Sequence, residues 1–155
     1  MKKIIVKLND RSYPIYIGKN ILSNKSLLGN IKSEKFAVVT NKKIKSLHLS
    51  KINNSSIKNN QIILNDGEKY KNQESIDKIY NYLLKNKYSR DSCIIAFGGG
   101  VIGDITGYAS ATYQRGINFV QIHSRPSVRN SAGRVAQLHF FIKIRSVQIH
   151  TKSGV

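Results

Sequence analysis

Residues 93–116, CIIAFGGGVIGDITGYASATYQRG, decide the fold of this chain. The apolar run Cys93–Phe97 predicts a buried strand that a glycine cluster ends. Residues 98–100 are all glycine, which permits positive φ and leaves no Cβ in the way of a ligand. A helix follows over about 101–113, with Asp104 expected in its first turn. Such a helix start offers main-chain N–H groups to a diphosphate, and the alternative interpretation is a strand-to-helix turn without a ligand.

Outward from this stretch, strands and helices alternate up to residue 122. Two short extended runs separated by Asn-Asp-Arg predict a β-hairpin. Apolar residues recur every three or four positions over 73–87, which predicts an amphipathic helix. The alternation predicts an α/β fold, a Rossmann-like layered parallel sheet with flanking helices and an N-terminal β-hairpin. The expected strands are 3–8, 12–17, 36–40, 61–64, 93–97 and 119–122, and the further expected helices are 19–32, 44–49 and 73–87, with 53–60 as connecting sequence.

Polar residues and turns follow three of these strands. Ligands of such sheets bind beyond the carboxyl ends of the strands, near the point where strand order reverses. Asn41 would contact a ribose or adenine edge, or it would serve as a turn amide. In the turn that starts at Asp66, the Glu68 carboxylate would accept hydrogen bonds from ribose hydroxyls. Lys71 would neutralise phosphate or pair with Glu68, whereas the alternative is an Asp-Gly turn that caps the following helix.

The net charge of +18 favours anionic partners. Basic residues are nevertheless spread along the chain among Asn and Ile, so compositional bias accounts for them and nucleic acid is not expected as a partner. No apolar run approaches the about 18 residues of a membrane span, and no membrane partner is expected. The single cysteine, Cys93, lies in an apolar strand. A buried thiol without a disulfide partner indicates a reducing compartment, and we expect a cytoplasmic protein.

Two motifs carry a resemblance to a known family. FGGGVIGDITGYASATYQRGINFVQI, residues 97–122, resembles the nucleotide-binding segment of the 3-dehydroquinate synthase family, with its GGGVxGDxxGFxAxxYxRG motif. DGEKYK, residues 66–71, resembles a second motif of that family, DGExxK. The resemblance covers roughly residues 1–122. It implies that NAD is bound by Asp66, Gly67, Glu68, Lys69, Tyr70, Lys71, Gly99, Gly100, Val101, Ile102, Gly103 and Asp104, and Asn41 is a further candidate because of its place at the end of a strand.

The resemblance also implies a reaction. The family's enzymes are shikimate-pathway lyases that convert a linear seven-carbon sugar-acid phosphate to 3-dehydroquinate. NAD transiently oxidises one hydroxyl, phosphate is eliminated, the ketone is reduced back and the ring closes, while a divalent metal (Zn²⁺ or Co²⁺) polarises the hydroxyl. The complete enzyme is expected to be a homodimer that acts on an anionic sugar phosphate. The residues leave open a related sugar-phosphate cyclase, a polyol dehydrogenase, or a non-catalytic basic module that binds nucleotides or nucleic acid.

After residue 122 the resemblance stops. His123, Ser124 and Arg125 stand where the family has a proline and two threonines, and no VDSSVGGKT-like block follows. Residues 123–155 contain six basic residues and no acid.

We therefore expect an NAD-binding domain over 1–122 and an atypical basic tail over 123–155, the product of a frameshift or a truncated gene. Resequencing around codon 122 tests this. The family's Glu/His/His metal ligands and its C-terminal helical domain cannot be placed on this sequence, so no catalytic or metal-binding residue is assigned and we expect no turnover by the isolated chain.

Overall fold

The computed structural model describes residues 1–155 apart from 10–11, 25–26, 28–30, 53, 127–137 and 146–155. Its strands are β1 (Lys2–Val6), β2 (Tyr13–Gly18), β3 (Phe36–Asn41), β4 (Gln61–Leu64), β5 (Cys93–Phe97), β6 (Asn118–Pro126) and β7 (Leu138–Arg145). Its helices are α2 (Lys42–His48), α3 (Ser55–Asn59), α4 (Gln73–Lys85) and α5 (Gly100–Thr112), with short 3₁₀ helices η2 (Ile21–Ser23), η3 (Leu49–Lys51), η4 (Glu68–Tyr70) and η5 (Tyr113–Arg115).

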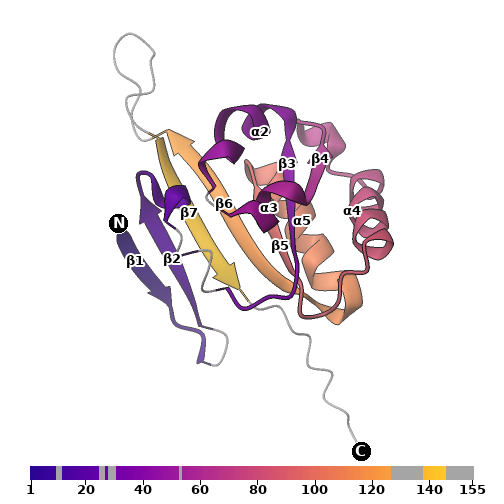
Figure 1. Ribbon diagram of the computed structural model, residues 1–155, viewed down its shortest axis with the longest axis horizontal. Coiled ribbons are helices and arrows are strands. Elements are labelled where there is room, and N and C mark those ends of the chain that lie inside the picture. Colours follow the sequence, from indigo (N-terminus) through magenta and orange to yellow (C-terminus); the bar gives the residue numbers. More distant parts are fainter. Residues whose placement is uncertain (10–11, 25–26, 28–30, 53, 127–137, 146–155) are drawn as a thin grey trace, which may run out of the picture.

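All seven strands form a single sheet in the order β1-β2-β7-β6-β5-β3-β4 (Figure 1). The strands β4, β3, β5 and β6 are parallel to one another. The strands β1 and β2 form an antiparallel hairpin in which Lys2 lies opposite Ile17. The predicted α/β fold, with its parallel sheet, flanking helices and N-terminal hairpin, is confirmed.

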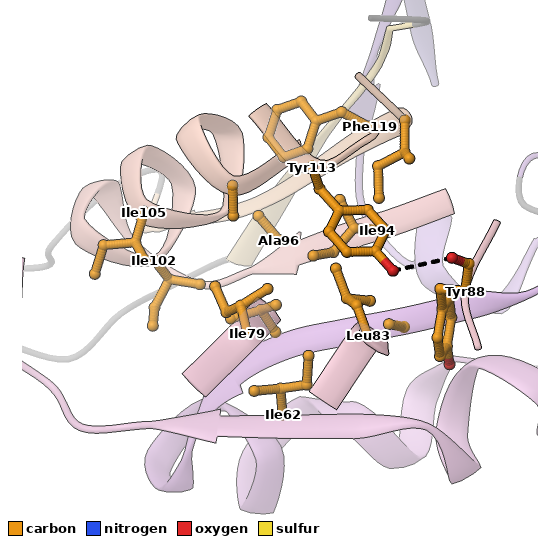
Figure 2. Close-up of a cluster of buried hydrophobic side chains, with 14 of the residues drawn as sticks. Ile62, Ile79, Leu83, Tyr88, Ile94, Ala96, Ile102, Ile105, Tyr113 and Phe119 are labelled. Atoms are coloured by element: carbon orange, nitrogen blue, oxygen red, sulfur yellow. Dashed lines mark hydrogen bonds between the residues drawn. The ribbon is translucent and has the colours of Figure 1, made fainter. Parts of the chain in front are cut away.

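Helices cover both faces of the parallel part of the sheet. On one face, α3 and η3 pack against β3 and β5 through a core of buried side chains that includes Ile57, Leu49, Val38 and Phe97. On the other face, α4 and α5 pack against the same strands through a second cluster, shown in Figure 2. Within that cluster the Tyr113 hydroxyl donates to the Tyr88 carbonyl oxygen at 3.0 Å. The members of this second core that are labelled in Figure 2 are Ile62, Ile79, Leu83, Tyr88, Ile94, Ala96, Ile102, Ile105, Tyr113 and Phe119.

These two helical layers place a topological switch point between β3 and β5. The chain leaves β3 towards the α2–α3 face and returns to the sheet at β4, on one side of β3. It leaves β5 towards the α5 face and returns at β6, on the other side. The two connections diverge at the carboxyl ends of adjacent parallel strands, and ligands of open α/β sheets bind at such a divergence.

Asparagine side chains start three of the helices. An asparagine that precedes a helix can accept a hydrogen bond from the main chain of the first turn and so satisfy a donor that would otherwise be unpaired. This contact fixes where α2, α3 and α4 begin. The Oδ1 atoms of Asn41, Asn54 and Asn72 accept from the N–H groups of Ile44, Ile57 and Ser75 at 2.8, 3.2 and 3.1 Å.

Two local predictions differ from the structure. Residues 53–60 were expected as connecting sequence, but Ser55–Asn59 forms the short helix α3 because Asn54 caps it and the fully buried Ile57 anchors it. A helix was expected over 19–32, yet the described residues there include the three-residue 3₁₀ helix Ile21–Ser23, preceded by Asn20 at φ +52°.

The sheet also includes strands from beyond residue 122. Strand β6 extends to Pro126, and β7 pairs antiparallel with both β2 and β6. No element was expected in this part of the sequence. Because β7 lies between β2 and β6, its backbone hydrogen bonds connect the N-terminal hairpin to the parallel strands. The division of the chain at residue 122 into a domain and a basic tail stays a prediction.

Candidate functional site

The glycine turn after β5 exposes bare main chain. Gly98 is buried and its N–H donates to the Ile122 carbonyl oxygen at 3.1 Å, whereas Gly99 and Gly100 are exposed. A Cβ added at Gly98 would lie 2.9 Å from the side chain of Ile102, but one added at Gly99 or Gly100 would meet no atom of the described residues within 4 Å. None of the three glycines has positive φ, so steric room rather than a left-handed conformation distinguishes these positions.

Helix α5 begins directly at this turn. Gly99 is the N-cap residue, with no side-chain cap, and its carbonyl oxygen accepts the Gly103 N–H at 3.0 Å. The N–H groups of the first turn have no acceptor within the helix. The expectation of Asp104 in the first turn is wrong, because the helix starts one residue earlier than expected and its first turn contains no acid. The positive end of the helix dipole is therefore not compensated locally, which suits an anion.

The other residues of this segment serve packing. Ile102 is 1% exposed and belongs to the core beneath α5, and Val101 packs half-buried against the same core. Gly103 is buried, and a Cβ there would clash with the terminal amide of Gln121 on β6. Their side chains hold α5 on the sheet, so only their main chain is open to a cofactor contact.

The Asp66–Lys71 motif forms a tight turn at the end of β4. Gly67 has φ +112° and ψ 153°, a conformation that glycine tolerates and other residues rarely adopt. The Tyr70 N–H donates to the Gly67 carbonyl oxygen at 3.1 Å and closes η4. Lys69 Nζ lies 5.0 Å from the centre of the Tyr70 ring, a cation–π contact. Glu68 stays exposed, so its carboxylate is open to a ligand.

Lys71 joins this motif to the glycine segment. Its Nζ lies 2.9 Å from Asp104 Oδ2 and 3.4 Å from Glu68 Oε1. The hydrogen bond and charge of Asp104, followed by the charge of Glu68, raise the pKa of the Lys71 ammonium above its usual value. The expected pairing with Glu68 is present, and a second pairing with Asp104 accompanies it. The three side chains form an ion cluster, named here the Lys71 cluster, that connects η4 to α5.

The structural alternative for the Asp66 turn is wrong. It proposed that the Asp-Gly turn caps the helix that follows, but the side chain of Asn72 caps α4. Asp66 itself is exposed at the end of β4. The Asp66 turn therefore does not cap α4.

Asn41 lies at the carboxyl end of β3, 5% exposed, and its Oδ1 caps α2. This is the turn-amide role that the sequence left open. Because Thr40 pairs with Phe97 across the β3–β5 ladder, Asn41 also lies beside the start of the glycine turn. Its contact with a cofactor stays a prediction.

The fold defined by these elements is that of the sugar-phosphate cyclases. The structure resembles crystal structures of 2-deoxy-scyllo-inosose synthase, with a TM-score of 0.67 and 17% identity over 77% of this chain and 35% of that one. A second 2-deoxy-scyllo-inosose synthase structure, in complex with carbaglucose-6-phosphate, NAD⁺ and Co²⁺, gives a TM-score of 0.66 and 16% identity over 95% of this chain and 43% of that one.

Sequence comparison finds more similar proteins within this class. Residues 61–128 match the family described as 3-dehydroquinate synthase N-terminal. The 3-dehydroquinate synthase of Ruthia magnifica is 47% identical over 125 residues, and that of Shewanella frigidimarina is 42% identical over 126 residues; each alignment covers 79% of this chain and 35% of the relative. This chain is similar to an N-terminal segment of these 3-dehydroquinate synthases, and it spans about a third of their length.

Proposed function

We propose that this chain is the NAD-binding part of a 3-dehydroquinate synthase, a carbon–oxygen lyase acting on a phosphorylated seven-carbon sugar acid. One observation carries the proposal. The Lys71 cluster joins the two motifs of the family at the carboxyl edge of the sheet, next to the β3–β5 switch point. The 42–47% identity to enzymes of that name favours this activity over the other cyclases, which are similar at 16–20% identity.

In this proposal the cofactor diphosphate lies on the exposed main chain at Gly99 and Gly100. The N–H groups of the first turn of α5 donate to its oxygens, and the absence of a Cβ allows close approach. Glu68 accepts hydrogen bonds from ribose hydroxyls, and Lys71 holds Glu68 and Asp104 in place. Bound NAD supplies reversible oxidation of a substrate hydroxyl.

The remaining partners are also proposals. The structural neighbours include cyclases solved with NAD⁺ and Co²⁺ or Zn²⁺, and we propose a divalent metal for the complete enzyme. The described residues contain no group of three or more His, Cys, Asp or Glu that could hold a metal, so we assign no metal ligand to them. In the same residues no helix is long and apolar enough to cross a bilayer. A sugar phosphate substrate, a homodimeric complete enzyme and a cytoplasmic location complete the proposal.

Thermal unfolding with and without NAD tests the cofactor assignment. A ligand that binds only the folded state stabilises it by about 2.7 kcal/mol at a concentration one hundred times its Kd. We expect the unfolding temperature to rise with NAD concentration and adenosine at equal concentration to have a smaller effect, because it lacks the diphosphate. An unfolding temperature that NAD leaves unchanged up to millimolar concentration would contradict the proposal.

A further inference from the structure

One face of β6 is turned towards α5, and its side chains meet the glycines of that helix in sequence. A Cβ added at Gly107 would lie 3.7 Å from Cζ of Phe119, which Figure 2 shows beside the helical layer. A Cβ added at Gly103 would clash with the amide of Gln121. A step of two residues forward along β6, from Phe119 to Gln121, therefore matches a step of four residues back along α5, from Gly107 to Gly103. This matches the geometry of the two elements, since both steps advance about 6–7 Å.

The next pair in this series is His123 and Gly99. His123 follows Gln121 on the same face of β6, because side chains alternate along a strand. The Gly98 N–H donates to the carbonyl oxygen of Ile122, which fixes this part of β6 beside the glycine turn. His123 is half-buried, and among the residues that the structure describes no atom lies within 4 Å of a Cβ built on Gly99. His123 thus continues the series that faces the glycines of α5, one residue beyond Ile122, the last residue of β6 that pairs with β5.

The charged side chains near the glycine turn favour a further hydrogen-bond donor there. In the Lys71 cluster, Lys71 pairs with Glu68 of η4 and with Asp104 of α5, the helix that starts at this turn. Because the cluster holds two carboxylates and one ammonium, Lys71 is already paired and supplies no spare positive charge for a diphosphate. An N–H donor on the β6 side would add a favourable contact to the diphosphate, because a hydrogen bond to a charged oxygen is stronger than one between neutral groups.

We propose that the His123 imidazole donates a hydrogen bond to a phosphate oxygen of the dinucleotide seated on Gly99 and Gly100. The residue is a binding residue that the two family motifs do not include. The inference rests on the proposed function, because it requires a dinucleotide at the glycine turn.

Equilibrium titration of the full chain tests the contact. NAD and ADP-ribose are titrated into the unaltered chain, into His123→Phe, whose ring has no hydrogen-bond donor, and into His48→Phe, a matched substitution on α2 at the opposite face of the sheet. We expect His123→Phe to weaken both ligands about fivefold or more, since a hydrogen bond to a charged group is lost, and His48→Phe to leave both affinities unchanged. Equal affinities in His123→Phe and the unaltered chain would overturn the inference alone, whereas failure of the unaltered chain to bind NAD would overturn the proposed function and the inference with it.

A measurement on the unaltered chain covers the case in which His123→Phe folds poorly. The imidazole ¹⁵N resonances, with that of His123 assigned by its loss in His123→Gln or His123→Asn, are followed during titration with ADP-ribose and separately with adenosine. A direct contact predicts a saturable shift of the His123 resonance with ADP-ribose and a much smaller one with adenosine. Equal responses to the two ligands would contradict a phosphate contact.

Discussion

Alanine at Gly99 or Gly100 should separate binding from folding. Gly99 has φ −81° and ψ −168°, and Gly100 is the first residue of α5, so alanine fits both backbone conformations. At either position an added methyl group meets no atom within 4 Å in the described part of the chain. The folded state therefore gains no strain, and the unfolded chain loses conformational freedom. We expect Gly99→Ala and Gly100→Ala to leave the free energy of unfolding unchanged or to raise it by about 0.4–1 kcal/mol.

The same methyl group would occupy the place of the diphosphate. If phosphate oxygens lie in hydrogen-bonding contact with this main chain, a Cβ forces them outward and weakens those bonds. Loss of about 1.4 kcal/mol corresponds to a tenfold weaker Kd, and we expect at least that change for NAD in both variants.

Gly98→Ala is the matched control. Its methyl group would lie 2.9 Å from Cβ and Cγ1 of Ile102, which is 1% exposed and fixed in the core. Overpacking of this kind costs about 1–3 kcal/mol of stability. The assay is chemical denaturation for stability and calorimetric titration for NAD. If Gly99→Ala and Gly100→Ala keep both full stability and full NAD affinity, the dinucleotide does not lie on this turn and the reasoning is refuted.

Three further predictions follow from the contacts described above. Lys71→Met should weaken NAD binding with little change in stability, because it removes the positive charge that balances the Glu68 and Asp104 carboxylates. Lys85→Met, at the far end of α4, should change neither NAD affinity nor stability. Equal losses of NAD affinity in both variants would argue for a general charge effect. Asn72→Ala should lower the free energy of unfolding by about 1 kcal/mol, measured by urea denaturation, and an unchanged midpoint would contradict its role as the cap of α4. Burial raises the pKa of the Cys93 thiol to about 12 from 9.0, so the folded protein should resist a thiol reagent at pH 8. Stability should decline as pH rises above 9, since in that range only the thiol of the unfolded chain ionises. Rapid labelling of the native protein would contradict the burial of this thiol.

The central strands could be predicted because each is a compact apolar run between turn residues. The runs at 61–64 and 93–97 coincide with β4 and β5 residue for residue. Helix α3 could not be predicted in the same way, because its sequence is polar apart from the buried Ile57 and its stability depends on a cap and one core contact. Strand β7 depends on hydrogen bonds to β2 and β6, which are distant in sequence.

The sequence likewise predicted the parts of the site that depend on local motifs, but not the contacts between segments that are distant in sequence. The motifs located the glycine turn and the Asp66 turn, since residue types and spacing carry that information. The pairing of Lys71 with Asp104 depends on strand order and on α4 and α5 sharing one face of the sheet, which spacing alone does not reveal. The position of His123 beside the glycine turn likewise depends on the register between β5 and β6.

Backbone amide mapping of the NAD complex is the most direct test of the proposed crevice. The full chain, labelled with ¹⁵N, is titrated with NAD while its amide resonances are followed. We predict saturable shifts that are largest at Gly99, Gly100 and Val101, with smaller ones at Glu68 and Lys71. Saturable shifts confined to the exposed surface of α4, or no saturable shift at all, would contradict a dinucleotide site between the carboxyl ends of β3 and β5.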